Sequence, residues 1–115
     1  MAVLNELTGV KVLVVDDDRN ARQSLSDVLA LFGAEVKEAS SGDEGLKVWQ
    51  AWRPSVLISD IGMPRMDGYQ FIRALRIIEH KENRPRTPAL AFSAYPPDQV
   101  RRLAKEAGFD LHVGK

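Results

Sequence analysis

The stretch KVLVVDDDRN, residues 11–20, decides the fold prediction, because a run of apolar β-formers ends there in three aspartates. Val and Leu at successive positions are typical of a strand that is covered on both faces, as in a parallel sheet. Neighbouring carboxylates at the end of such a strand would repel one another. We therefore expect either a solvated turn or a positive charge at this point.

Length and composition indicate one ordinary globular domain. The 115 residues are 44% hydrophobic and 28% charged, which is enough for one core. Sixteen Lys and Arg balance sixteen Asp and Glu, which argues against a general electrostatic affinity for nucleic acid or anionic membranes. Cysteine is absent, which excludes disulfides and thiolate metal sites. No stretch has the length and apolarity of a membrane span or a signal peptide, so we expect a cytoplasmic domain.

Strand-like and helix-like patterns alternate along the chain. Five strands are predicted, at residues 10–15, 34–39, 56–60, 89–92 and 109–113. Four helices separate them, at residues 20–32, from 41 or 42 to 53, from 67 through 78, and from 96 or 97 to 108. This alternation predicts right-handed βαβ units and an α/β fold, with a doubly wound parallel sheet and helices on both faces.

Helical spacing also predicts which side chains face the core. The inward residues would be Ala21, Leu25, Val28, Leu29 and Phe32, then Leu46, Trp49 and Trp52, then Phe71, Ile72, Leu75 and Ile78, and finally Val100, Leu103, Ala104 and Ala107. Asp18 and Asp67 are expected to cap helices. Residues 79–88 are predicted to be a polar surface connection.

Chemically active side chains follow the predicted strands at the edge where open parallel sheets bind ligands. They are Asp16 and Asp17 after the first strand, Asp60 after the third, Ser93 after the fourth and Lys115 after the fifth. Carboxylates without Cys or paired His suit Mg²⁺ or Mn²⁺, which would relieve their repulsion. An aspartate at a strand end can attack phosphorus, and a metal ion, a lysine and a hydroxyl can neutralise phosphoryl oxygens. The set therefore predicts a site that makes and holds an aspartyl phosphate.

Four motifs make the chain resemble the receiver domain of two-component response regulators, including chemotaxis regulators: VLVVDDD, VLISDIGMPRMDG, AFSAY and AGFDLHVGK. The resemblance runs from about Val10 to Lys115. It implies a flavodoxin-like sheet with strand order 2-1-3-4-5 and a single domain over residues 1–115, of which 1–9 are an N-terminal extension. The family also continues with a fifth helix after the lysine, which the 115-residue sequence does not contain.

The resemblance implies a role for each matching residue. Asp60 would accept the phosphoryl group, and Lys115 would pair with it. Asp16, Asp17, Asp60 and the backbone carbonyl of Gly62 would hold Mg²⁺ or Mn²⁺. Ser93 would follow the phosphate in the conformational switch. His112 takes the position of the family's switch aromatic, and Gly62 has no side chain to gate the site.

The implied partner is a histidine kinase or a histidine phosphotransfer protein, whose phosphohistidine is the donor. The chain would then be a signalling phosphoacceptor that assists its own phosphotransfer and autodephosphorylation, rather than a turnover enzyme. It could stand alone, belong to a longer regulator or form part of a hybrid histidine kinase. We expect no direct binding of nucleic acid or membrane by this domain.

Two other functions remain open from the residues alone. A haloacid-dehalogenase-type phosphatase needs a second aspartate two residues after its nucleophile, and Asp16 and Asp18 have that spacing. A pseudo-receiver would be an interaction module that is never phosphorylated. Without a fifth helix, strands 10–15 and 109–113 would expose apolar side chains. We therefore expect the 115 residues to be either the ordered part of a longer chain or a fragment that covers this surface by self-association, for example as a homodimer.

Overall fold

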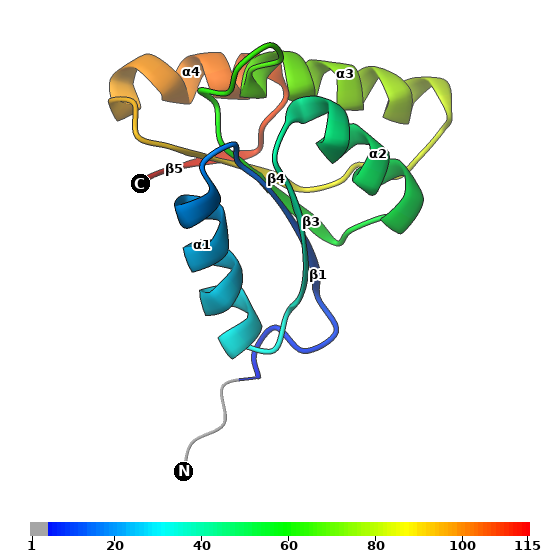
Figure 1. Cartoon of the computed structure of the whole chain (residues 1–115). Helices are drawn as coiled ribbons and strands as arrows, with labels where there is room; N and C mark the ends of the chain where they lie inside the picture. The colour runs from blue at the N-terminus through cyan, green and yellow to red at the C-terminus, as the bar shows by residue number, and fades with distance from the viewer. Residues whose placement is uncertain (1–4) are drawn as a thin grey trace.

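The computed structural model describes residues 5–115, in which strands and helices alternate along the chain (Figure 1). The strands are β1 (Lys11–Val15), β2 (Glu35–Ala39), β3 (Val56–Ser59), β4 (Ala89–Ser93) and β5 (Leu111–Gly114). The helices are α1 (Arg19–Leu31), α2 (Gly42–Trp52), α3 (Gly68–Lys81) and α4 (Pro97–Ala107). All strand pairs are parallel, in the order β2-β1-β3-β4-β5, which confirms the predicted sheet.

Local capping interactions begin the helices where the sequence predicts. The Asp18 carboxylate accepts hydrogen bonds from the backbone N–H groups of Asn20 and Ala21 at the start of α1. Asp67 begins α3 in a capping box, in which its carboxylate accepts from Gln70 N–H and the Gln70 side chain accepts from Asp67 N–H. These bonds satisfy amide groups that have no partner inside the helix.

The helices divide between the two faces of the sheet (Figure 1). Helices α2, α3 and α4 cover one face, where Leu13, Leu57 and Phe71 lie in the main core. Helix α1 packs on the other face against β1 and β2. The main core therefore lies between the sheet and helices α2, α3 and α4, and among the described helices α1 alone covers the opposite face.

Two of the predicted inward side chains are exposed, so those assignments are wrong. Val28 in α1 is 52% exposed and Leu103 in α4 is 47% exposed. In α4 the buried residues are Val100, Ala104 and Ala107, whose spacing defines a narrow stripe with Leu103 on its flank. The apolar pattern therefore overestimated the width of each buried face.

The last strand begins later than predicted. Gly108 ends α4 with a φ of 132°, and Phe109 N–H bonds back to the carbonyl of Ala104. Phe109 therefore belongs to the helix end, although its side chain is buried in the core. The strand itself starts at Leu111.

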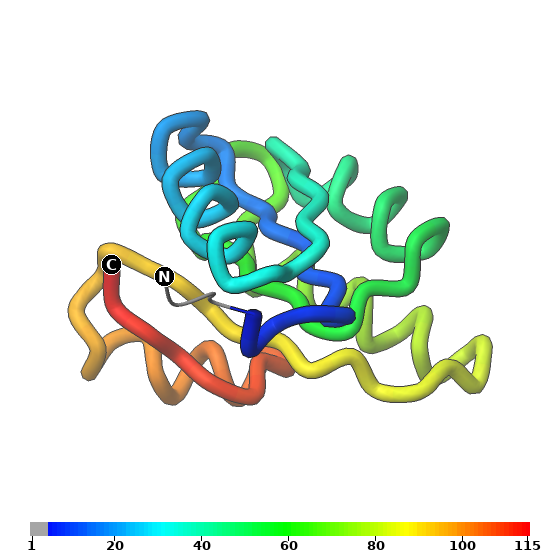
Figure 2. The backbone as a smooth tube through the Cα atoms, turned by 90° about the horizontal axis from the view of Figure 1, so that it is seen from below, coloured from blue at the N-terminus to red at the C-terminus, as the bar shows by residue number. Residues whose placement is uncertain are grey.

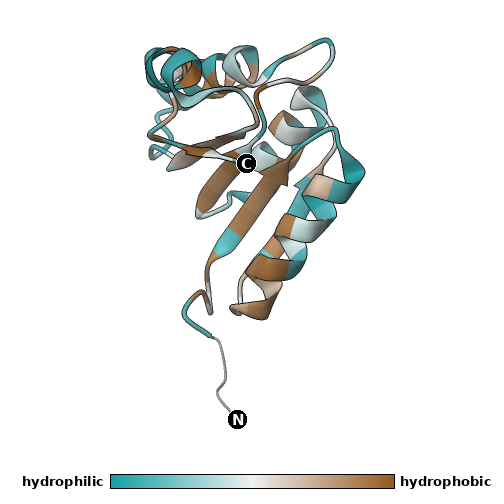
Figure 3. Ribbon diagram, turned by 90° about the vertical axis from the view of Figure 1, so that its left-hand side faces the viewer, coloured by the Kyte–Doolittle hydropathy of each residue, from teal (hydrophilic) through white to brown (hydrophobic). Residues whose placement is uncertain are grey.

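Strand β5 forms an edge of the sheet, opposite β2 (Figure 2). Its side chains Leu111 and Val113 are 65% and 45% exposed, because α1 packs mainly against β1 and β2. Figure 3 looks onto this side, where apolar strands lie beside the C-terminus. The prediction of exposed apolar residues is correct for β5 but wrong for β1, since Val12 and Val14 are only 1% exposed.

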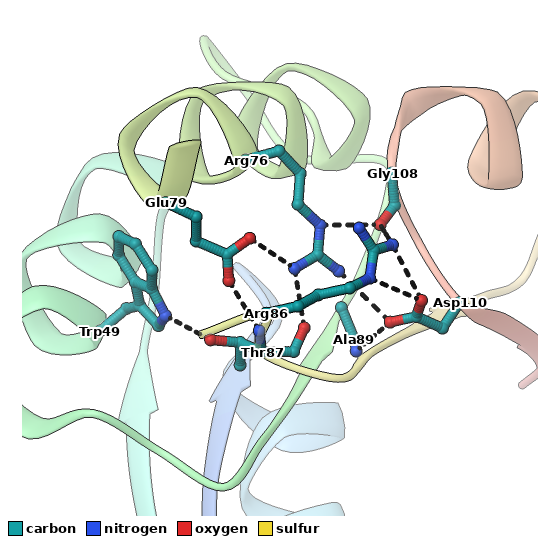
Figure 4. A network of polar contacts seen from close by, with 8 residues as sticks. All are labelled: Trp49, Arg76, Glu79, Arg86, Thr87, Ala89, Gly108 and Asp110. Carbon is teal, nitrogen blue, oxygen red and sulfur yellow. Dashed lines mark hydrogen bonds and ion pairs between the residues drawn. The ribbon is translucent and has the colours of Figure 1, made fainter. Parts of the chain in front are cut away.

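A polar network joins α2, α3, β4 and the α4–β5 turn at the amino-terminal ends of β4 and β5 (Figure 4). Glu79 accepts hydrogen bonds from Arg76 at 2.9 Å and from Thr87 N–H at 2.6 Å, and the Thr87 hydroxyl accepts from the Trp49 indole at 2.9 Å. Glu79 and Thr87 are buried, so residues 79–88 are not simply the surface connection that the sequence predicts. These polar groups can be buried because tertiary packing supplies them with hydrogen-bond partners.

Asp110 closes this network at the start of β5. Its carboxylate accepts from Ala89 N–H and from the guanidinium groups of Arg76 and Arg86. Burial acts to raise the pKa of Asp110, but these hydrogen bonds and charges outweigh it and hold the pKa below its usual value. The network thus joins α3 to the amino-terminal ends of β4 and β5, and its two arginines balance the charges of Glu79 and Asp110.

Candidate functional site

The carboxyl ends of four strands bring the predicted site residues to one edge of the sheet. Asp16 follows β1, Asp60 follows β3, Ser93 ends β4 and Lys115 follows β5. Backbone hydrogen bonds hold these ends together, since the Asp60 N–H donates to the carbonyl of Val15 and the Lys115 N–H donates to the backbone carbonyl of Ser93. The parallel topology therefore assembles the group from distant parts of the sequence.

Three carboxylates form the centre of the group. One oxygen each from Asp16, Asp17 and Asp60 lies within 4.8 Å of the others. Asp16 is buried, Asp60 is partly buried and Asp17 is exposed. Burial first, and then the charge of Asp16, raise the pKa of Asp60, while Lys115 and the Ile61 N–H act to lower it. The repulsion that the sequence predicts is therefore present at this edge.

Lys115 supplies the positive charge. Its Nζ lies 2.8 Å from Asp16 Oδ2 and 3.4 Å from Asp60 Oδ1. Burial lowers the pKa of Lys115, but the hydrogen bond to Asp16 and the charge of Asp60 outweigh it, and the net pKa is raised. The ammonium group thus bridges two of the three carboxylates.

Backbone donors orient both of these carboxylates. Asp16 Oδ1 accepts from Asp18 N–H at 2.9 Å, while Asp60 Oδ1 accepts from Ile61 N–H at 2.8 Å. Arg22 in α1 donates to the backbone carbonyl of Asp16 at 2.8 Å and pairs with Glu38. These bonds hold the chain after β1 and β3 in one geometry, so the acidic group is preorganised.

The loop after β3 is packed tightly onto Asp60. Gly68 N–H donates to the carbonyl of Ile61 at 2.7 Å, and a Cβ at position 68 would collide with the backbone carbonyl of Asp60. Ile61 and Met63 of the same loop are buried in the core. The glycine of the MPRMDG motif is therefore explained by close backbone approach.

Ser93 and His112 are less closely tied to the acidic group. Ser93 is buried, and its Oγ accepts from Tyr95 N–H at 3.0 Å, with no hydrogen bond to Asp60 among residues 5–115. The Nε2 of His112 is buried without a partner within the described part of the chain. Gly62 lies two residues after Asp60, where its missing side chain leaves room for the Tyr95 phenol.

The donor set fits a hard divalent cation. Clustered carboxylate oxygens are the ligands that Mg²⁺ and Mn²⁺ prefer, and the sequence contains no cysteine that would favour zinc. Asp16, Asp17 and Asp60 are the residues that could hold the ion. Asp18 is turned to the amide groups of α1, so it does not contribute to the group.

Sequence reasoning missed two residues that contact the site from outside. Arg22 holds the Asp16 carbonyl, and Tyr95 holds Ser93 Oγ. Helical spacing contained no signal for the contact of Arg22 with the site, because the Asp16 carbonyl that it binds is a backbone atom, which no side-chain pattern identifies. The glycine at position 62 was a signal for Tyr95, since a glycine outside a turn often marks the close approach of another group.

Comparison with known proteins gives the family. The chain matches the family model described as the response regulator receiver domain over residues 12–115. An uncharacterized 14.6 kDa protein in the sodA1 3′ region of Leptolyngbya boryana is 34% identical over 112 residues, which are 97% of this chain and 83% of that protein. Response regulator MprA of Mycobacterium ulcerans (strain Agy99) is 36% identical over 106 residues, 92% of this chain. The chain spans only 44% of the length of MprA.

Solved structures agree with this match. Chemotaxis protein CheY4 of Vibrio cholerae superposes with a TM-score of 0.83 at 34% identity, covering 92% of this chain and 86% of that one. The receiver domain of the Arabidopsis thaliana histidine kinase CKI1, complexed with Mg²⁺, has a TM-score of 0.85 at 30% identity, covering 96% and 86%. Within residues 5–115 no helix is long and apolar enough to cross a membrane. The parallel sheet, the acidic group at its edge and the match over residues 12–115 lead to one conclusion: the chain belongs to the response regulator receiver domain family.

Proposed function

We propose that the chain is a phosphoacceptor, in which Asp60 takes a phosphoryl group from a phosphohistidine. The observation that carries this proposal is the position of Lys115, whose ammonium nitrogen lies between carboxylate oxygens of Asp16 and Asp60. A cation held beside the acceptor is suited to neutralise a new phosphoryl oxygen. A solvated acidic turn would need no such partner.

The proposed reaction needs one nucleophile and no external co-reactant. A carboxylate oxygen of Asp60 attacks the phosphorus, and the phosphorus–nitrogen bond breaks as the imidazole leaves with the electron pair and takes up a proton. Mg²⁺ or Mn²⁺, when held by Asp16, Asp17, Asp60 and the Gly62 carbonyl, would neutralise charge on the phosphoryl oxygens. Lys115 and the Ser93 hydroxyl would bind other oxygens, and Ser93 and His112 would carry the switch.

The partners and setting follow from the same proposal. The donor would be a histidine kinase or a histidine phosphotransfer protein, and the domain would work in the cytoplasm. Its own residues would assist phosphotransfer and later hydrolysis, without steady turnover of a small substrate. The similar receiver domain of CKI1 belongs to a histidine kinase. The proposal therefore includes the possibility that this domain is part of a hybrid histidine kinase.

The competing phosphatase function lacks its acid–base group. It needs an aspartate two residues after the nucleophile, but the Asp18 carboxylate accepts from the amides of Asn20 and Ala21. Steady hydrolysis of para-nitrophenyl phosphate, lost in Asp16→Asn, would favour that class instead. We expect no such turnover.

Intact mass spectrometry tests the proposal. With Mg²⁺ and acetyl phosphate as a small donor, the wild type should gain one phosphate, and Asp60→Asn should gain none. Asp43→Asn is the matched control, since Asp43 is an exposed residue in the first turn of α2. A phosphate that remains on Asp60→Asn would refute the acceptor assignment, and a wild type that gains none would favour the pseudo-receiver.

A further inference from the structure

Tyr95 links the two loops that border the acidic group. Its backbone N–H donates to Ser93 Oγ at 3.0 Å, while its side chain reaches across to the loop after β3. A Cβ added at Gly62 would lie 2.6 Å from the Tyr95 hydroxyl oxygen and 3.2 Å from its Cζ atom. The phenol therefore occupies the space where a side chain at position 62 would begin.

A second observation places the Tyr95 phenol near the first turn of α3, which contains Tyr69. Burial raises the pKa of the Tyr69 phenol, and the charges of Asp67 and then of Tyr95 raise it further. Tyr69 itself packs against the main core. The Tyr95 phenol therefore lies over Gly62 and near Tyr69, although the residue is 49% exposed.

The bond from Tyr95 has a consequence for Ser93. A serine hydroxyl has two acceptor lone pairs and one donor hydrogen. Tyr95 N–H uses one lone pair, and no hydrogen bond in residues 5–115 uses the Ser93 hydrogen as a donor. The hydrogen is therefore free for an oxygen bound at the carboxyl ends of the strands, while one lone pair of Oγ is used by the Tyr95 N–H.

We propose that Tyr95 is a positioning residue for Ser93. Gly62, which has no side chain, forms the seat for the Tyr95 phenol, meaning the space that the phenol occupies. The seat holds the backbone of Tyr95, which in turn holds Ser93 Oγ in the orientation that donates to a phosphoryl oxygen on Asp60. This inference rests on the proposed phosphoacceptor function. It assigns the glycine at position 62 a steric role in addition to that of its backbone carbonyl.

The seat is tested first without any ligand. The chain has two tyrosines, so 3-fluorotyrosine labelling should give two fluorine resonances, which Tyr95→Phe and Tyr69→Phe assign. Gly62→Ala should displace the Tyr95 resonance. Gly114→Ala should leave it in place, because a Cβ at Gly114 meets no atom within 4 Å. An unchanged Tyr95 resonance in Gly62→Ala would overturn the proposal.

The second test measures the affinity for beryllofluoride, a phosphoryl mimic, in the presence of Mg²⁺. Gly62→Ala and Tyr95→Ala should each weaken binding by about three- to tenfold, which is the size of one misplaced hydrogen bond. In a Ser93→Ala background Gly62→Ala should have no further effect, since it acts through the serine. An equal loss with and without Ser93 would contradict the proposed route.

The affinity for Mg²⁺ alone separates the role of Tyr95 from that of the metal ligands. By calorimetry, Mg²⁺ should bind Tyr95→Ala and the wild type within twofold, because Tyr95 is not one of the residues that hold the ion. A loss of Mg²⁺ affinity in Tyr95→Ala that parallels its loss of beryllofluoride affinity would assign the effect to the metal group and refute the positioning role of Tyr95. A wild type that binds no beryllofluoride would instead refute the proposed function, while beryllofluoride binding that is equal in both proteins would refute this inference alone.

Discussion

Lys115 donates a hydrogen bond of 2.8 Å to Asp16 Oδ2, although 99 positions separate the two residues. The exposed fractions of the two side chains are 23% and 5%, so the pair is shielded from water. The net effect on the pKa of Lys115 is an increase above 10.5, which keeps the ammonium charged at neutral pH. One positive charge thus faces three carboxylates, and the local charge is negative without a bound cation.

The first prediction follows from this excess of negative charge. Without metal, Asp60→Asn should raise the Tm at pH 7, because it removes a charge that burial and Asp16 disfavour. A gain of about 1 kcal/mol in the free energy of unfolding would raise the Tm by roughly 4 °C. Thermal unfolding followed by circular dichroism measures the change, and a lower Tm would contradict the prediction.

The sign of the pH dependence gives a control. The folded-state pKa of Asp60 is raised, so its protonation stabilises the native state below the unfolded value of about 3.8. That contribution is lost as the pH rises through the folded pKa. The advantage of Asp60→Asn should therefore shrink as the pH falls toward 3.8. An advantage that is independent of pH would point to a cause other than charge.

The second prediction concerns metal binding. We expect Mg²⁺ to bind the acidic group only in the folded state, so a concentration of 100 times Kd should stabilise the wild type by about 2.7 kcal/mol. Asp17→Ala removes one of the three carboxylates and should respond much less. Asp43→Ala, an exposed acid outside the group, should respond like the wild type. Equal shifts in Tm for Asp17→Ala and the wild type would place the ion elsewhere.

The third prediction concerns the polar network at the other end of the sheet. Glu79→Ala should lower the free energy of unfolding by about 3 kcal/mol, because it removes the buried carboxylate that pairs with Arg76 and leaves the Thr87 N–H without its acceptor. Glu82→Ala breaks the exposed pair with Arg84 and should cost less than about 1 kcal/mol. Urea unfolding of both variants tests the contrast. Similar losses would mean that the buried pair adds little beyond a surface one.

The fourth prediction concerns the exposed side chains of β5. A protein of this 115-residue sequence should self-associate through Leu111 and Val113, because large apolar patches favour contact with another chain. Leu111→Lys should make the protein monomeric by light scattering, without loss of stability. Leu103→Lys, on the exposed flank of α4, should leave association unchanged. A wild type that is monomeric at high concentration would contradict this prediction.

The sequence alone determined the order and type of the elements and where several of them begin. Asp18 and Asp67 cap their helices through bonds to residues two or three positions away, so the local sequence contains the whole interaction. The apolar runs before Asp16 and Asp60 likewise contain the strands that they form. Parallel topology then made it predictable that Lys115 would come to the same edge, because strand direction alone brings these ends together.

The tertiary structure decided which side chains are covered and which polar groups find partners. Val28 and Leu103 follow the helical pattern but are exposed, while Glu79 lies in a polar stretch but is buried. The Tyr95 phenol lies over Gly62 and the Tyr95 N–H donates to Ser93 Oγ, and no spacing pattern in the sequence predicts these contacts. The physical reason is that burial and hydrogen bonding depend on atoms brought together from distant parts of the chain, whereas sequence patterns describe only neighbours along it.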